Sequence, residues 1–126
     1  MIKVISMWNY SSIVSRDAAE AHYHDVHIPL AMRLFNDLPG VLGYVQKRVG
    51  PSLTRDVVTG EPRGTPPPFE WLIELELRSL DTLGELSRHA LIEDLAQDHH
   101  NFMDNAASRT NDLYIVEDNV LFRRGN

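Results

Sequence analysis

The chain has 126 residues, which suits a single domain with its own core, and a formal net charge of −6 at pH 7. The acidic excess argues against nucleic acid as a partner, and the absence of cysteine excludes disulfides and thiolate nucleophiles. No apolar run is long enough for a membrane helix and no signal peptide is visible, so we expect no membrane partner and a cytoplasmic location.

The first half of the chain predicts a strand, a long helix and a second strand. Ile2–Tyr10 is rich in β-branched and aromatic residues, which favours a strand. Ser15 can cap a helix that continues to about Asn36, where a Pro-Gly pair ends it. Val41–Val49 predicts the second strand.

Residues 50–68, GPSLTRDVVTGEPRGTPPP, differ in kind because they are dense in Gly, Pro and Thr. A stretch of this length without regular structure is uncommon inside a compact domain and is usually functional or disordered. Two interpretations stay open, a mobile surface insertion and a lid over a site.

The second half predicts a strand, two helical runs and a final strand. Apolar residues alternate with mainly polar ones over Phe69–Arg78, which indicates a strand with one buried face. A helix is expected over Leu80–Arg88 with Ser79 as its cap. A second helical run extends to about Ala107, and Leu113–Arg123 predicts the last strand.

The order β-α-β-β-α-β predicts an α+β, ferredoxin-like fold over one domain, residues 1–126, without an internal repeat. In that fold a four-stranded antiparallel sheet has its helices on one face. The other face would carry Tyr44, Leu72 and an apolar set from the first strand. Such a face needs a cover, and a second copy of the sheet is the simplest one, so a homodimer is expected.

Three histidines lie close together in AHYHDVHIPL, Ala21–Leu30. At about 100° per residue, the core-facing stripe of the helix consists of Ala19, Tyr23, Val26, Leu30 and Leu34. His27 lies about 60° from the centre of this stripe. His24 lies about 120° away, and His22 lies about 80° away on the other side. The three side chains are therefore not expected to converge, and no metal site is predicted.

Pro29 interrupts this helix two residues after His27. Proline cannot donate to the carbonyl of Asp25, and its ring pushes that turn open, which could tilt His27 into a cavity. Alternatively, a new helical turn begins at Pro29.

The second helical run places an aspartate on an apolar stripe, which consists of Leu91, Leu95, Asp98, Phe102 and Ala106. An ionised carboxylate there needs a partner or a shifted pKa. His27 or a tyrosine could be that partner, and a His–Asp pair can transfer protons near neutral pH. Alternatively, Asp98 caps a backbone turn or reaches solvent at the helix edge.

Two segments resemble signatures of the EthD family. One has an aromatic residue, a His-x-Pro-Leu motif, a Leu-Pro-Gly turn and a strand that opens with an aromatic residue, here Tyr23, His27, Pro29, Leu30, Leu38, Pro39, Gly40 and Tyr44. The other has an aspartate, a phenylalanine four residues later and a further aspartate, here Asp98, Phe102 and Asp104. Residues 50–68 look like an insertion. The resemblance implies a dimeric α+β barrel, in which two ferredoxin-like sheets pack face to face.

Similar barrels include cofactor-free monooxygenases, polyketide cyclases, methylmuconolactone isomerase and proteins with no proven activity, so the fold alone does not give the reaction. The leading hypothesis is a cofactor-independent isomerase, cyclase or lyase that acts on a small carbonyl or lactone compound in a degradation or secondary-metabolite pathway. The alternatives are a cofactor-free monooxygenase and a non-catalytic small-molecule binding or accessory protein.

In the leading hypothesis His27 is the base or acid and Asp98 orients it or balances its charge. The residues expected to bind a substrate are Trp8, Tyr23, His24, Tyr44, Trp71 and Phe102. No cofactor and no metal are expected.

Overall fold

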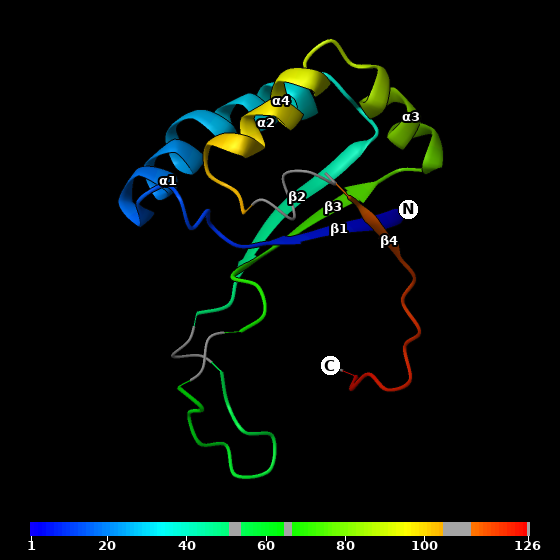
Figure 1. Ribbon diagram of the computed structural model, residues 1–126. Coiled ribbons are helices and arrows are strands. Elements are labelled where there is room, and N and C mark those ends of the chain that lie inside the picture. Colours follow the sequence, from blue (N-terminus) through cyan, green and yellow to red (C-terminus); the bar gives the residue numbers. More distant parts are fainter. Residues whose placement is uncertain (51–53, 65–66, 105–111, 126) are drawn as a thin grey trace.

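The computed structural model describes residues 1–50, 54–64, 67–104 and 112–125, and it has one layer of helices on one face of an antiparallel sheet (Figure 1). The strand order in the sheet is β2-β3-β1-β4, and each neighbouring pair is antiparallel. The strands are β1 (Ile2–Trp8), β2 (Val41–Arg48), β3 (Trp71–Leu77) and β4 (Tyr114–Val116). This arrangement confirms the predicted α+β, ferredoxin-like fold.

The helical layer is formed by the two segments that connect parallel strands. The first is a continuous helical stretch whose parts are α1 (Arg16–His22), the π-helical turn η1 (Tyr23–His27) and α2 (Ile28–Asn36). The second contains α3 (Leu80–Arg88), α4 (Ile92–Asp98) and the 3₁₀ turn η3 (His99–Asn101). In the ranges described above, no helix has the length and apolar character needed to cross a membrane.

The predicted N-terminal cap is present in α1 and absent from α3. The hydroxyl of Ser15 accepts a hydrogen bond from the backbone N–H of Ala18 at 3.3 Å, as an N-cap does. Ser79, the predicted cap of α3, makes no side-chain capping bond in the described structure. Its hydroxyl therefore does not define where α3 begins.

Two predicted elements near the C-terminus are shorter than expected. The second helical run ends at Asn101 instead of about Ala107, because the chain turns back after η3 and Asp104 donates its backbone N–H to Asn9. The predicted residues 105–107 lie outside the described residues. The last strand is three residues long and not eleven, since the chain pairs with β1 only over Tyr114–Val116.

The segment between β2 and β3 contains a small hairpin within residues 54–64. Arg55 pairs with Pro62, and the carboxylate of Asp56 accepts the backbone N–H groups of Val58 and Thr59 at 2.9 Å. The hairpin projects from the sheet on the side away from the helices (Figure 1). The remaining parts of the predicted 50–68 loop, residues 51–53 and 65–66, lie outside the described residues.

The pairing register assigns the side chains of the strands to two faces. Directly opposite residues share a face, and the buried Val4, Trp8, Leu75 and Leu77 identify the face under the helices. Leu72 lies on the open face beside Met7, as predicted.

Tyr44 does not lie on the open face, and that prediction was wrong. A register shift between Val41 and Gly43 adds one residue to β2. An added residue reverses which side chains point inward, so Tyr44 pairs with Leu75 under the helices. Its ring packs edge-on against Phe35, with 5.0 Å between the ring centroids.

Candidate functional site

A cavity of about 590 Å³ lies between the helices and the sheet, and we refer to it as the interlayer cavity. Its inner wall is apolar and includes Phe35, Ile73, Leu75, Leu86, Ile92 and Leu95. Polar residues also line it, among them Tyr23, His27, Tyr44 and His99. Its size and its mixture of apolar walls with a few polar groups are typical of a site for a small organic molecule.

The π-helical turn η1 directs His27 toward this cavity. The backbone N–H of Ile28 bonds to the carbonyl of Tyr23, five residues earlier, instead of the carbonyl four residues earlier. The wider turn accommodates Pro29, which has no N–H and whose ring would clash with the carbonyl four residues before it in a regular α-helix. As a result His27 is buried, whereas Val26 is 46% exposed. The prediction that Val26 belongs to the core stripe was therefore wrong.

His27 is paired with Asp98 of α4. Its Nδ1 lies 2.9 Å from Oδ2 of Asp98, and both side chains are buried. Burial lowers the pKa of His27 to about 4, although the hydrogen bond to Asp98 acts in the opposite direction. The imidazole is therefore neutral at neutral pH. Nδ1 faces the carboxylate, so Nε2 is the ring nitrogen that Asp98 leaves unbonded, and His27 lines the cavity.

Asp98 remains ionised because its oxygens accept several hydrogen bonds. Burial by itself would raise the pKa of Asp98, but hydrogen bonds from Asn101, His22 and His27 outweigh burial and lower it. Asn101 Nδ2 donates to Oδ1 at 2.9 Å. An ionised carboxylate can only accept, so each imidazole that bonds to it contributes an N–H.

His22 also bonds to this carboxylate, with 2.7 Å between its Nε2 and Oδ1 of Asp98. The prediction that the histidines of α1 and η1 do not converge was thus wrong for His22 and His27. They are five residues apart, which would place them about 140° apart on a regular α-helix. The i→i+5 turn brings them to the same side of the helix.

Two tyrosine hydroxyls lie beside each other at the cavity. The hydroxyl of Tyr23 is buried and has no hydrogen-bond partner of ordinary geometry in the described part of the chain. Its pKa is raised, mainly by burial and additionally by the neighbouring Tyr44, and burial also raises the pKa of Tyr44. Both phenols therefore keep their protons and can donate hydrogen bonds to a bound molecule.

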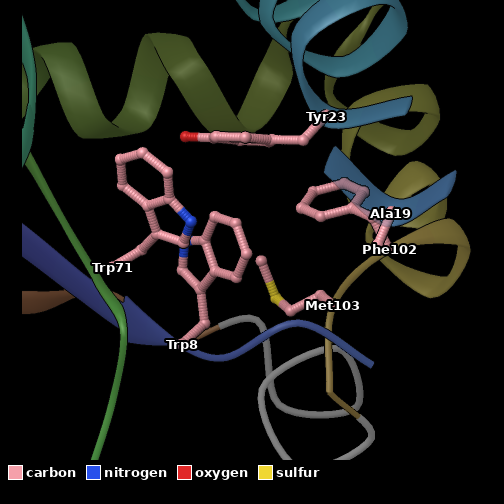
Figure 2. Packing of buried hydrophobic residues seen from close by; sticks show 6 residues of the cluster. All are labelled: Trp8, Ala19, Tyr23, Trp71, Phe102 and Met103. Carbon is pink, nitrogen blue, oxygen red and sulfur yellow. The ribbon is translucent and has the colours of Figure 1, made fainter. Parts of the chain in front are cut away.

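An aromatic cluster supports the Tyr23 side of the cavity (Figure 2), and its buried members are Trp8, Ala19, Tyr23, Trp71, Phe102 and Met103. In Figure 2 the hydroxyl of Tyr23 points away from Phe102, toward the side where Trp71 lies. The ring of Phe102 lies 4.6 Å from the ring of His27, measured between centroids. The cluster therefore determines the positions of both Tyr23 and His27.

The residues predicted to bind a substrate fall into three groups. Trp8, Tyr23 and Tyr44 line the interlayer cavity together with His27. Trp71 and Phe102 are buried in the aromatic cluster, behind the described wall. His24 is exposed at the surface and lies outside the described lining.

Among the residues that the structure describes, no group of three or more His, Asp or Glu side chains is placed to hold a metal ion. The short distances around Asp98 are hydrogen bonds.

Sequence reasoning missed both His22 and Asn101, which bond to the carboxylate of Asp98. The available signal was the spacing of His22 and His27, five residues apart, directly before Pro29. A proline inside a helix is one cause of a widened turn, and that turn aligns residues five apart.

Comparison with protein families gives a match over residues 13–106 to the family described as the EthD domain. Comparison with curated protein sequences gives no match.

Several solved structures have a similar fold. An EthD family protein from Bacillus halodurans has a TM-score of 0.58 at 18% identity, and the comparison covers 94% of this chain and 98% of that one. HapK from Hahella chejuensis has a TM-score of 0.59 at 13% identity, with both chains covered completely. A dimeric ferredoxin-like protein of unknown function from Thermobifida fusca has a TM-score of 0.54 at 13% identity, with 91% and 86% covered. At these identities the similarity shows the fold and nothing about the reaction.

Proposed function

The chain belongs to the EthD family, and we propose that it is a cofactor-independent enzyme that transfers a proton next to the carbonyl group of a small, mainly apolar ketone or lactone. The observation that carries this proposal is the position of His27, which lines the interlayer cavity while Asp98 holds its Nδ1. Isomerisation, cyclisation and elimination can each begin with such a proton transfer.

His27 has the properties of a general base in this reaction. It is neutral at neutral pH, so its Nε2 can accept a proton from a carbon next to the carbonyl. The ionised Asp98 would then stabilise the imidazolium and keep its orientation, as the carboxylate of a catalytic triad does. The same imidazolium can return the proton to a second carbon, which completes an isomerisation without any oxidant or cofactor.

The hydroxyls of Tyr23 and Tyr44 are suited to stabilise the charge that develops on the substrate. Removal of the proton leaves negative charge on the carbonyl oxygen, and donors already aimed at that oxygen lower the barrier. A buried hydroxyl with no hydrogen-bond partner of ordinary geometry among the described residues, such as that of Tyr23, gains a bond when a substrate oxygen binds. The apolar wall would hold the rest of the substrate and exclude water.

The proposal predicts that the protein accelerates hydrogen–deuterium exchange at the acidic carbon of a test ketone. We expect 2-tetralone in D₂O to exchange faster with the protein than in buffer, and His27→Gln to lose about 10²–10⁴-fold of the acceleration. Proton NMR of the ketone measures the rate. His100→Gln is the matched control, because His100 is exposed, and it should retain the rate. Equal rates for His27→Gln and the unmodified protein would contradict the assignment.

Two measurements with the same ketone distinguish the two alternatives. A cofactor-free monooxygenase would consume oxygen during turnover, which an oxygen electrode detects. A binding or accessory protein would bind the ketone without accelerating exchange, and His27 and Asp98 would then serve only to join η1 to α4.

We also infer that the protein forms a homodimer through the open face of the sheet. That face carries the apolar side chains of Ile5, Met7, Val45, Leu72 and Tyr114. Met7, Val45 and Tyr114 are more than a third exposed in the single chain. The same face carries the charged side chains of Glu74 and Lys47, which pair with each other. Exposed apolar side chains on a sheet face are typical of an interface, and a second copy offers a surface of the same chemistry.

Substitution of Val45 with arginine should convert the inferred dimer into a monomer, because it would bury an unpaired charge in the interface. Analytical ultracentrifugation of the unmodified protein and the variant measures the mass. Ile13→Arg is the control, since Ile13 is 79% exposed and lies between β1 and α1, outside the strands of the sheet. A monomeric unmodified protein would disprove the inference.

A further inference from the structure

His22 lies outside the interlayer cavity but bonds to the carboxylate that holds His27. The side chain of His22 is 26% exposed, whereas that of His27 is 7% exposed. The two imidazoles and Asp98 thus form a chain of hydrogen bonds that leads from solvent to the cavity wall. No signature pattern in the sequence indicated a role for His22.

We propose that His22 is a positioning residue, which holds Asp98 from the solvent side and thereby sets the tautomer and orientation of His27. The proposal rests on the proposed function, because the orientation of His27 matters only if His27 acts as a base. The hydrogen bonds on which it is built do not depend on that function. A carboxylate rotates easily about its terminal torsion, and its two oxygens are equivalent until bonds distinguish them. His22 and Asn101 occupy Oδ1, which leaves Oδ2 directed at Nδ1 of His27.

The tautomer of His27 follows from this arrangement. Because the carboxylate can only accept, Nδ1 of His27 must carry the proton, and Nε2 then carries the lone pair. If Asp98 turned away, the proton could move to Nε2, and the base would be lost. In that tautomer Nε2 of His27 would be an N–H donor instead of a proton acceptor.

The surroundings of His22 favour a fixed ring. It stacks on Phe102, with 6.0 Å between the ring centroids and 26° between the planes. Around Asp98, the side chains that approach from η1 and η3 include His27 and Asn101, and His99 packs against the His27 ring at 5.0 Å. The π-helical turn is essential to this arrangement, since it aligns His22 with His27.

NMR of the imidazole nitrogens tests the proposal without any substrate. In the unmodified protein at pH 7 we expect a single His27 tautomer, with a slowly exchanging proton on Nδ1. His22→Leu removes the donor to Oδ1, so the exchange of this proton should become about tenfold faster, the factor expected for one lost hydrogen bond. The spectrum of His27 should also show both tautomers.

Two further variants make the test specific. His22→Gln keeps an N–H donor and should restore the single tautomer and the slow exchange. His100→Gln should leave both unchanged, because His100 is exposed. An unaltered His27 in His22→Leu would overturn the proposal, and so would a His22→Gln variant that behaves like His22→Leu. A failure of the ketone exchange assay would leave these NMR results unaffected, so the two proposals can fail separately.

Discussion

Replacement of Phe102 with alanine should reduce the free energy of unfolding by about 3–5 kcal/mol, the range for truncation of a buried aromatic side chain. Phe102 is fully buried, and its ring lies within 5.3 Å of the rings of Trp8, Tyr23 and His27, measured between centroids. The substitution would leave a cavity that these large, rigid rings cannot fill. Urea denaturation at pH 7, followed by tryptophan fluorescence, measures the loss.

Phe102→Leu is the matched control for this experiment. Leucine retains most of the buried volume, so it should cost less than half as much as alanine. A loss below about 1 kcal/mol for Phe102→Ala would contradict the assignment of Phe102 to the core. The protein concentration must be the same for each variant, because the proposed dimer would be stabilised by mass action.

Residue composition, apolar–polar alternation and helix signals predicted the sheet and the helical layer that covers it. The strand predicted over Phe69–Arg78 from its period of two lies at Trp71–Leu77. The helix predicted to follow Ser79 lies at Leu80–Arg88, although Ser79 makes no side-chain capping bond. The hydroxyl of Ser15 identified the start of the first helix, because a capping group acts on the neighbouring backbone only. Local interactions of this kind can be read from the chain directly.

Errors arose where one extra residue entered a regular element. The register shift at Val41–Gly43 turned Tyr44 from the open face to the helical face. The π-helical turn exchanged the roles of Val26 and His27, since each later residue is displaced around the helix. Neither insertion has a sequence signature comparable to a strand or a cap, and both depend on packing against the other layer.

Both displaced residues, Tyr44 and His27, line the interlayer cavity. The register shift in β2 and the π-helical turn η1, which the sequence pattern did not predict, therefore place these two polar residues at the candidate site. This is expected on physical grounds, because a regular helix and a regular strand would place apolar side chains at these positions. The His27–Asp98 pair was nevertheless foreseeable, since a carboxylate in the centre of an apolar stripe requires a partner.

The burial that keeps His27 neutral should also make the protein sensitive to acid. Its pKa falls from 6.5 to about 4 on folding, so the unfolded chain binds the proton more tightly than the folded protein. The stabilising effect is complete above about pH 6.5 and is lost as the pH falls toward 4. At about 1.4 kcal/mol per pKa unit, His27 should account for a loss of roughly 2–3 kcal/mol between pH 7.5 and pH 4.5.

Urea unfolding of His27→Gln at the two pH values isolates this contribution, because glutamine does not titrate. The loss of stability between pH 7.5 and pH 4.5 should be smaller in the variant by roughly 2–3 kcal/mol, whatever its stability at pH 7.5. His100→Gln should lose as much as the unmodified protein, since His100 is exposed. An equal loss in His27→Gln would mean that His27 is not held neutral by burial, and the general-base role would lose its physical basis.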